Sequence, residues 1–212
     1  MKKKNEAVVS TLSKIGWGSD EIRNVKDIYK GSMFFDETRG EVHIGEVIEM
    51  ILDAFEMVMD QGPLAREPCM KMKVTLEDIK LHEDAIHRGP AQVYPAVREA
   101  ITEAMRGANA TMLEPMQIHV IEVPENFMGA ATKLVGGKRG QLLDMTQEMG
   151  QASIKAKIPV AEMIGWSSDL RSATEGRGTS SLLDQQFEKI PASLQEDVIR
   201  KIRDRKGLAE NQ

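Results

Sequence analysis

The segment Leu81–Pro90 contains the chain's densest group of side chains that can do chemistry. It carries two histidines, two carboxylates and an arginine, namely His82, Glu83, Asp84, His87 and Arg88. A metal site here is disfavoured, because the spacing of the two histidines matches no helix face and no cysteine or third histidine follows nearby. Glu83 and Asp84 are a poor catalytic pair, because adjacent carboxylates rarely converge on one substrate. With metal binding and carboxylate catalysis disfavoured, the function left for this segment is the binding of an anion.

An anion would meet this segment at the start of a helix. Pro90 predicts that start, because proline at a first helical position leaves no N–H group unpaired. The first turn of a helix has free N–H groups and a partial positive charge, and Arg88 adds a planar cation suited to phosphate. The segment could therefore be a rigid tip that meets an anionic backbone. The alternative, favoured by the residues alone, is an ordinary strand-to-helix turn with Arg88 in solvent.

Other basic residues form two clusters. One is Lys138-Arg139, and the other lies near the C-terminus, at Arg200, Lys201, Arg203, Arg205 and Lys206. RNA contact by either cluster is possible, although a solvated face also explains both. The glycines around Lys138 do not make a phosphate loop, because no Ser or Thr follows the lysine and a strand is expected next. No motif predicts a catalytic residue or a cofactor site.

The composition of the whole chain indicates a globular protein without an overall basic surface. It has 212 residues, 41% of them hydrophobic and 29% charged, and a net charge of −5. Any contact with nucleic acid must therefore use a local patch. The single cysteine, Cys69, excludes an intrachain disulfide and fits a reducing cytoplasm. No segment has the length and apolarity of a membrane span.

Periodicity predicts the elements of the first half. The spacing of Ile22, Val25 and Ile28 predicts a short helix that Gly31 ends. A strand, a long helix, a strand and a second helix are then expected at 32–36, 42–60, 69–80 and 90–107. The second helix follows the Leu81–Pro90 segment directly.

The second half has a different order of elements. Strands are expected at about 114–123, 141–147, 151–158 and 182–187, with helices at 124–134 and 159–171. This order, strand-helix-strand-strand-helix-strand, is that of the ferredoxin-like split unit. A last helix is expected at 192–206. The fold class is therefore α+β with two domains, 1–112 and 113–212.

Leu81–Gln92 closely resembles the tip loop of domain four in the archaeal elongation factor two family of translocation GTPases. Shorter blocks agree with that family in order and spacing, namely Asp27–Tyr29, Gly62–Ala65, Leu113–Pro115, Lys138–Gly140, Leu170–Gly176 and Arg203–Leu208. The likeness covers nearly the whole chain after about residue 20.

The resemblance implies a fold and a function for each half. Residues 1–112 would be domain four, related in fold to the second domain of ribosomal protein S5, and residues 113–212 would be a ferredoxin-like domain five with a C-terminal helix. In the family, the histidine that matches His87 is converted to diphthamide, a bulky cationic group. Asp84, Arg88 and Gly89 would complete an RNA-contacting loop, with Lys138 and Arg139 as secondary RNA contacts.

The implied partners are the ribosome and the enzymes that make diphthamide, in the cytoplasm and without a membrane. The tip would reach the tRNA and mRNA in the decoding centre during GTP-dependent translocation. This chain would hold no cofactor and would be no enzyme by itself, because GTP and magnesium belong to the GTPase domain of the full-length factor.

Two departures from the family keep an alternative open. The GTPase domain, the two domains after it and the strand that opens domain four are not recognised, and Gly178–Leu183 lacks an aromatic residue expected there. The alternative is a stand-alone truncated paralogue that binds the factor site of the ribosome and regulates translation. A third reading, an unrelated small enzyme, lacks a nucleophile, a base and an anion site in one place.

Overall fold

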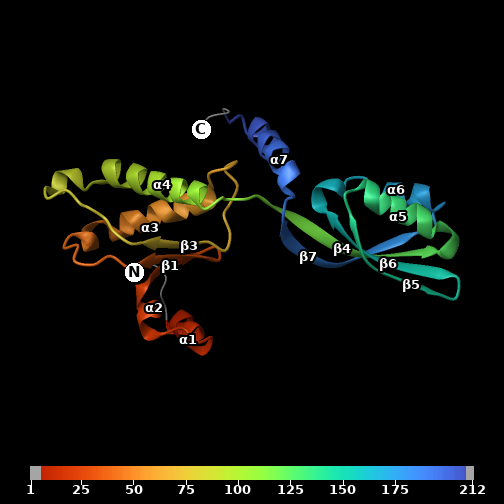
Figure 1. Ribbon diagram of the computed structural model, residues 1–212, viewed down its shortest axis with the longest axis horizontal. Coiled ribbons are helices and arrows are strands. Elements are labelled where there is room, and N and C mark those ends of the chain that lie inside the picture. The colour runs from red at the N-terminus through yellow and green to blue at the C-terminus, as the bar shows by residue number, and fades with distance from the viewer. Residues whose placement is uncertain (1–5, 209–212) are drawn as a thin grey trace. The chain divides into compact units, whose positions relative to one another are not determined.

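The computed structural model describes residues 6–208 and divides into two compact units (Figure 1). Unit one comprises the described residues up to Ala110 together with those from Glu196 on, and unit two comprises Thr111–Gln195. Residues 1–5 and 209–212 of the expected domains lie outside the described residues. Helices and two separate sheets confirm the predicted α+β class.

Unit one is built on a three-stranded sheet in the order β1-β2-β3. β1 (Val25–Tyr29) and β2 (Ser32–Asp36) are antiparallel, whereas β2 and β3 (Lys73–Leu76) are parallel. A parallel pair needs a crossover connection, and α3 (Ile44–Asp60) supplies it. α3 covers one face of the sheet, and α4 (Pro90–Gly107) packs against α3 (Figure 1).

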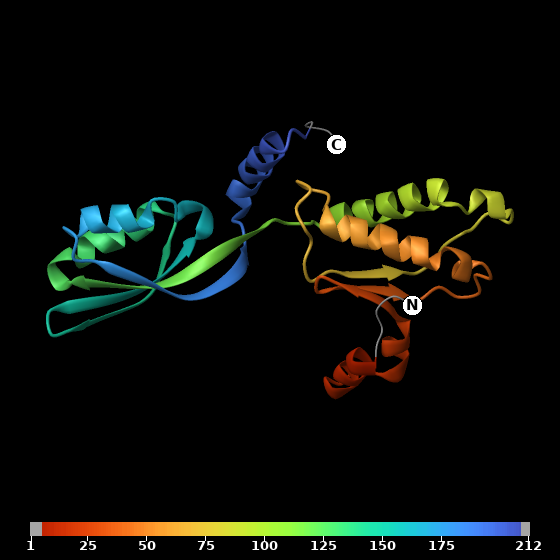
Figure 2. The ribbon, with the colours of Figure 1, turned by 180° about the vertical axis from the view of Figure 1, so that it is seen from behind.

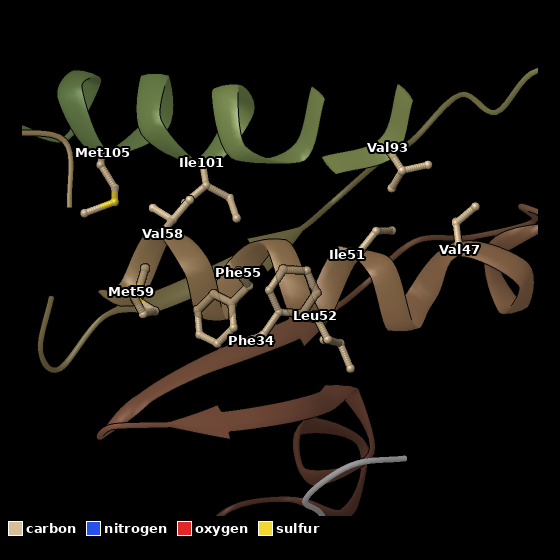
Figure 3. Close-up of a cluster of buried hydrophobic side chains, with 10 residues drawn as sticks. All are labelled: Phe34, Val47, Ile51, Leu52, Phe55, Val58, Met59, Val93, Ile101 and Met105. Atoms are coloured by element: carbon tan, nitrogen blue, oxygen red, sulfur yellow. The ribbon is translucent and has the colours of Figure 1, made fainter. Parts of the chain in front are cut away.

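The main core of unit one fills two layers, one between this sheet and α3 and one between α3 and α4 (Figure 3). Its buried members are Phe34, Val47, Ile51, Leu52, Phe55, Val58, Met59, Val93, Ile101 and Met105. The predicted helices are thus confirmed, since their apolar residues recur on one face. The two helices run in the same direction (Figure 3). Their N-terminal ends therefore lie at the same end of unit one.

Two short helices cover the opposite face of the same sheet, α1 (Glu6–Lys14) and α2 (Ser19–Asn24) (Figure 1 and Figure 2). They form a small second core in which Leu12 and Ile22 pack with Val25 and Phe35 of the sheet. The three-stranded sheet is therefore covered on both faces.

The short helix expected through Ile28 is wrong beyond Asn24, because the chain turns there into β1. Lys30 and Gly31 have φ values of 47° and 78°, and Tyr29 pairs with Ser32 across them. These are features of a two-residue hairpin turn, which favours glycine at its second position. The spacing of apolar residues fitted a helix, but the β-branched residues pair with β2 instead.

β3 is shorter than the strand expected at 69–80. It spans Lys73–Leu76 and pairs with Met33–Asp36 of β2. β2 itself ends at Asp36, so the residues after Leu76 have no neighbouring strand to bond. They continue as a loop to the end of unit one, where α4 begins.

Unit two is a four-stranded antiparallel sheet with two helices on one face (Figure 1). The strands are β4 (Leu113–Pro124), β5 (Gln141–Glu148), β6 (Gln151–Pro159) and β7 (Thr179–Lys189), in the order β5-β6-β4-β7. The helices are α5 (Met128–Gly137) and α6 (Trp166–Ala173). This topology confirms the predicted ferredoxin-like unit.

The helix expected at 159–171 is only partly correct. Val160–Glu162 form a single 3-10 turn, and α6 starts at Trp166 after Gly165, whose φ is 79°. Such a left-handed residue interrupts a right-handed helix. Trp166 and Leu170 then pack into the core of unit two with Ile121 and Ile154.

The last helix, α7 (Ala192–Arg205), belongs partly to each unit. Within unit two, the side chain of Gln195 donates to the carbonyl of Ile190. Within unit one, Arg203 donates to the carbonyl of Leu64, and Lys206 lies 2.7 Å from a carboxylate oxygen of Glu67. Two cations of the C-terminal basic cluster are thus engaged inside the protein.

Candidate nucleic-acid interface

Residues 82–88, here called the tip segment, connect the loop after β3 to the start of α4. Asp84 Oδ1 accepts the N–H of Ile86 at 3.2 Å, and the N–H of Asp84 donates to His82 Nδ1 at 3.0 Å. Ala85–His87 form one 3-10 turn, in which His87 donates its N–H to the Asp84 carbonyl at 3.1 Å. The tip segment therefore satisfies much of its own backbone.

His87 lies on the exposed side of this turn. Its ring packs edge-on against the ring of His82, with the centroids 4.5 Å apart. Within residues 6–208, its imidazole makes no hydrogen bond or ion pair, whereas that of His82 accepts one from the backbone. His87 is thus the histidine of the pair that remains available to a partner.

Arg88 corrects the expectation of an outward-facing cation. Only 6% of its side chain is exposed. Nε and Nη2 donate to Glu46 Oε2 at 3.0 and 2.6 Å, and Nη1 donates to the carbonyls of His82 and Glu83 at 2.7 and 2.6 Å. Because these contacts occupy the guanidinium, Arg88 holds the tip segment and is not presented to a phosphate.

Glu46 was not among the residues predicted from the sequence. It lies in the first turn of α3, and its second carboxylate oxygen is 2.8 Å from Nδ1 of His43. The hydrogen bonds from Arg88 and then His43 hold the pKa of this carboxyl below its usual value. The sequence can show that an acidic residue lies in the first turn of a predicted helix, but it cannot show that this residue pairs with an arginine 42 residues away.

Two helix N-termini lie at this end of unit one. α3 begins at Ile44 after His43, and α4 begins at Pro90 after Gly89. Pairs between the two helices confirm that they run in parallel: Glu46 bonds Arg88 just before α4, and Asp53 bonds Tyr94 within it. Each N-terminus carries a partial positive charge of about half an elementary unit. These two ends favour an anion.

Gly89 supports the turn through its backbone. It is the N-cap of α4, with an extended conformation, and its carbonyl accepts the N–H groups of Gln92 and Val93 at 3.1 and 3.0 Å. A β-carbon at Gly89 would lie 3.3 Å from Gln92 Oε1, a tight contact. The close atom is the end of a flexible side chain, so this contact can be relieved by a small movement of Gln92.

The exposed charges of the tip segment are negative. Glu83 and Asp84 are exposed, and the one permanent cation, Arg88, is buried. Ile86 adds a large apolar side chain with 73% of its surface exposed. Attraction of an anion to the tip segment thus depends on the N-terminal ends of α3 and α4 and on the charge of the His87 side chain.

Lys138 and Arg139, expected as possible secondary RNA contacts, both form ion pairs within unit two. Lys138 Nζ lies 2.8 Å from Asp169 Oδ2. Arg139 makes two hydrogen bonds to Glu114, at 3.1 and 2.9 Å, and one to Glu162, at 2.9 Å. These two carboxylates raise the pKa of Arg139 further above its usual value. Both cations join segments of unit two.

The remaining candidate groups are structural. His119 is buried, with Nδ1 2.9 Å from Ser180 Oγ, which also accepts the indole N–H of Trp166 at 3.0 Å. Burial lowers the pKa of His119. Burial also raises the pKa of the Cys69 thiol, which is unfavourable for a nucleophile.

Neither a metal site nor a membrane span is found between residues 6 and 208. No cluster of three or more His, Cys, Asp or Glu side chains there could hold a metal ion. No helix in the same range is long and apolar enough to cross a bilayer.

Comparison with known families covers nearly the entire chain. Residues 1–109 match the family model for elongation factor G, domain IV, and residues 111–211 match the model for the elongation factor G C-terminus. The chain belongs to this family of translation elongation factors. The second match begins where unit two begins, at Thr111, and it also includes the described residues from Glu196 on, which belong to unit one.

Archaeal proteins named elongation factor 2 are close relatives. Those from Nanoarchaeum equitans and Methanocaldococcus jannaschii are 51% and 48% identical over 98% of this chain, and that from Pyrococcus furiosus is 46% identical over 97%. The chain spans 28% of the length of each of these relatives. It therefore corresponds to the C-terminal domains of an archaeal-type elongation factor.

Proposed function

We propose that this chain is the ribosome-binding C-terminal part of an elongation factor that promotes translocation of tRNA and mRNA. The tip segment reaches the decoding centre, and His87 is the residue converted to diphthamide. The observation that supports this best is an exposed histidine on a turn fixed at the ends of two parallel helices, whose imidazole makes no hydrogen bond within residues 6–208.

The charges of the tip segment give a physical reason for a cationic modification of His87. An unmodified tip segment offers two exposed carboxylates beside the positive helix ends, with Arg88 withdrawn. A cationic group on His87 would offset part of that negative charge at the point proposed to meet RNA. Since phosphates dominate contacts with RNA, one added cation at a fixed position can strengthen binding and set its orientation.

GTP hydrolysis would belong to the part of the factor outside this chain. In this proposal, neither unit one nor unit two catalyses a reaction. Each unit by itself supplies a scaffold of regular helices and strands, and unit one holds the tip segment on its scaffold.

Cosedimentation with archaeal ribosomes over a series of salt concentrations tests the proposal. The wild-type chain, His87→Ala and a control at an exposed position of α4, Glu99→Gln, would be compared. We expect salt-sensitive binding by the wild type and the control, and weaker binding by His87→Ala. Absence of ribosome binding at low salt, or binding by His87→Ala equal to the wild type, contradicts the proposal.

A further inference from the structure

Glu46 and Arg88 form the long-range connection that holds the tip segment to the body of unit one. Arg88 is the buried member, with 6% of its side chain exposed, whereas Glu46 is about half exposed. Both Nε and Nη2 of Arg88 donate to the same oxygen of Glu46. A guanidinium held by a carboxylate in this way has a fixed plane and direction, because the hydrogen bonds are charge-assisted.

The fixed guanidinium in turn holds the backbone of the tip segment. Nη1 donates to two successive carbonyls, those of His82 and Glu83. With these two carbonyls directed to Arg88, the chain continues outward, and Asp84, Ile86 and His87 are all exposed. The direction in which His87 projects is therefore set by Arg88.

Glu46 is itself oriented from the opposite side. Its Oε1 lies 2.8 Å from His43 Nδ1, while Oε2 receives Arg88. Its place in the first turn of α3 is also favourable for a carboxylate, because of the positive helix end. Three interactions therefore fix one carboxylate in one orientation.

We propose that Glu46 is a positioning residue for His87, acting through Arg88 on the carbonyls of His82 and Glu83. The inference rests on the proposed function, because it assigns to Glu46 the task of presenting the modified histidine to the ribosome. Glu46 itself needs no contact with RNA.

A positioning role predicts a local effect rather than global unfolding. The main core of unit one lies along α3 and α4, and the Glu46 side chain is about half exposed. Loss of its charge should therefore free the tip segment while the core stays folded. Local openings of this kind are detected as faster amide hydrogen exchange in the affected segment alone.

The test compares Glu46→Gln with Glu99→Gln, which makes the same chemical change at an exposed position of α4. Arg88→Met serves as a second variant that keeps an apolar stem and removes the cation. The amides of Ile86, His87 and Arg88 report on the tip segment, because each donates within it. We expect their exchange to rise about tenfold in Glu46→Gln, with the Phe55 amide unchanged.

Ribosome binding by the same variants gives the functional result. Glu46→Gln should bind as weakly as His87→Ala, and the double variant Glu46→Gln/His87→Ala should be no weaker than His87→Ala alone. Such non-additivity is expected when two residues act as one unit.

The possible failures are distinguishable. Unchanged exchange of the tip amides in Glu46→Gln overturns the inference, and so does normal ribosome binding by Glu46→Gln when His87→Ala is defective. If His87→Ala also binds normally, the proposed function is contradicted instead.

Discussion

Replacing Arg139 by methionine removes a guanidinium that joins three segments of unit two. Arg139 follows α5, and its partners Glu114 and Glu162 lie in β4 and in the turn after β6. Methionine retains an apolar stem but makes none of the three hydrogen bonds. The family resemblance implied a secondary RNA contact for Arg139, and the ion pairs observed in unit two point to a structural role as well.

The size of the effect follows from the exposure of the two carboxylates. Glu114 has only 12% of its side chain exposed, so the loss of its bidentate partner should cost about 1–3 kcal/mol. Glu162 is 37% exposed and can be rehydrated, so its share is about 0–1 kcal/mol. We expect a total loss of about 1–4 kcal/mol in the free energy of unfolding of unit two. Adding Glu114→Gln removes the unpaired charge and should recover part of this loss.

Urea unfolding followed by tryptophan fluorescence measures this loss. The two tryptophans, Trp17 and Trp166, lie in different units, so a Trp17→Phe background reports unit two alone. A lower transition midpoint with an unchanged slope is expected, together with normal ribosome binding in the absence of urea. An unchanged midpoint combined with weaker ribosome binding would refute the structural role and restore Arg139 as an RNA contact.

Three further predictions concern the stability of each unit. Burial lowers the pKa of His119, so the unfolded state binds the proton more readily than the folded state, and unit two should lose stability as pH falls below about 6.5. The urea midpoints at pH 7.5 and pH 5.5 should differ less in His119→Gln than in the wild type, and an equal difference would exclude His119 as the cause. Gly140→Ala places a β-carbon 2.6 Å from Val135 Cγ1 and 2.8 Å from the Val135 carbonyl oxygen, and should lower the stability of unit two by about 1–3 kcal/mol in the same assay. A midpoint equal to that of the wild type would show that the backbone adjusts to the β-carbon without loss of stability. Phe55→Ala empties a fully buried position and should lower the stability of unit one by about 3–5 kcal/mol, as reported by Trp17 in a Trp166→Phe background. An unchanged Trp17 transition would contradict the assignment of this core.

The sequence predicted the elements whose pattern is local. α3 and α4 were predictable because their apolar residues recur at helical spacing, and the topology of unit two followed from its order of strands and helices. β1 was missed because Ile22, Val25 and Ile28 fit a helical period, while the decisive feature was pairing across the turn at Lys30. Pairing with a neighbouring strand is a tertiary effect that overrides local spacing.

The candidate site, too, was predictable from the sequence only where its features are local. The position of the tip segment before a helix could be predicted, because Pro90 marks a helix start. The burial of Arg88 could not, because Glu46 lies 42 residues away and nothing in the local sequence specifies that pair. The partners of Arg139 were unpredictable for the same reason. In each case a cation that local context assigns to solvent is used to join distant segments.

Mass spectrometry of the protein purified from its native host tests the central claim most directly. Trypsin should release Leu81–Arg88, which contains both histidines of the tip segment. We predict a mass increase that fragmentation places on His87, whose imidazole makes no hydrogen bond within the described residues, and not on His82, whose Nδ1 accepts the N–H of Asp84. An unmodified peptide, or a modification on His82, would contradict the account.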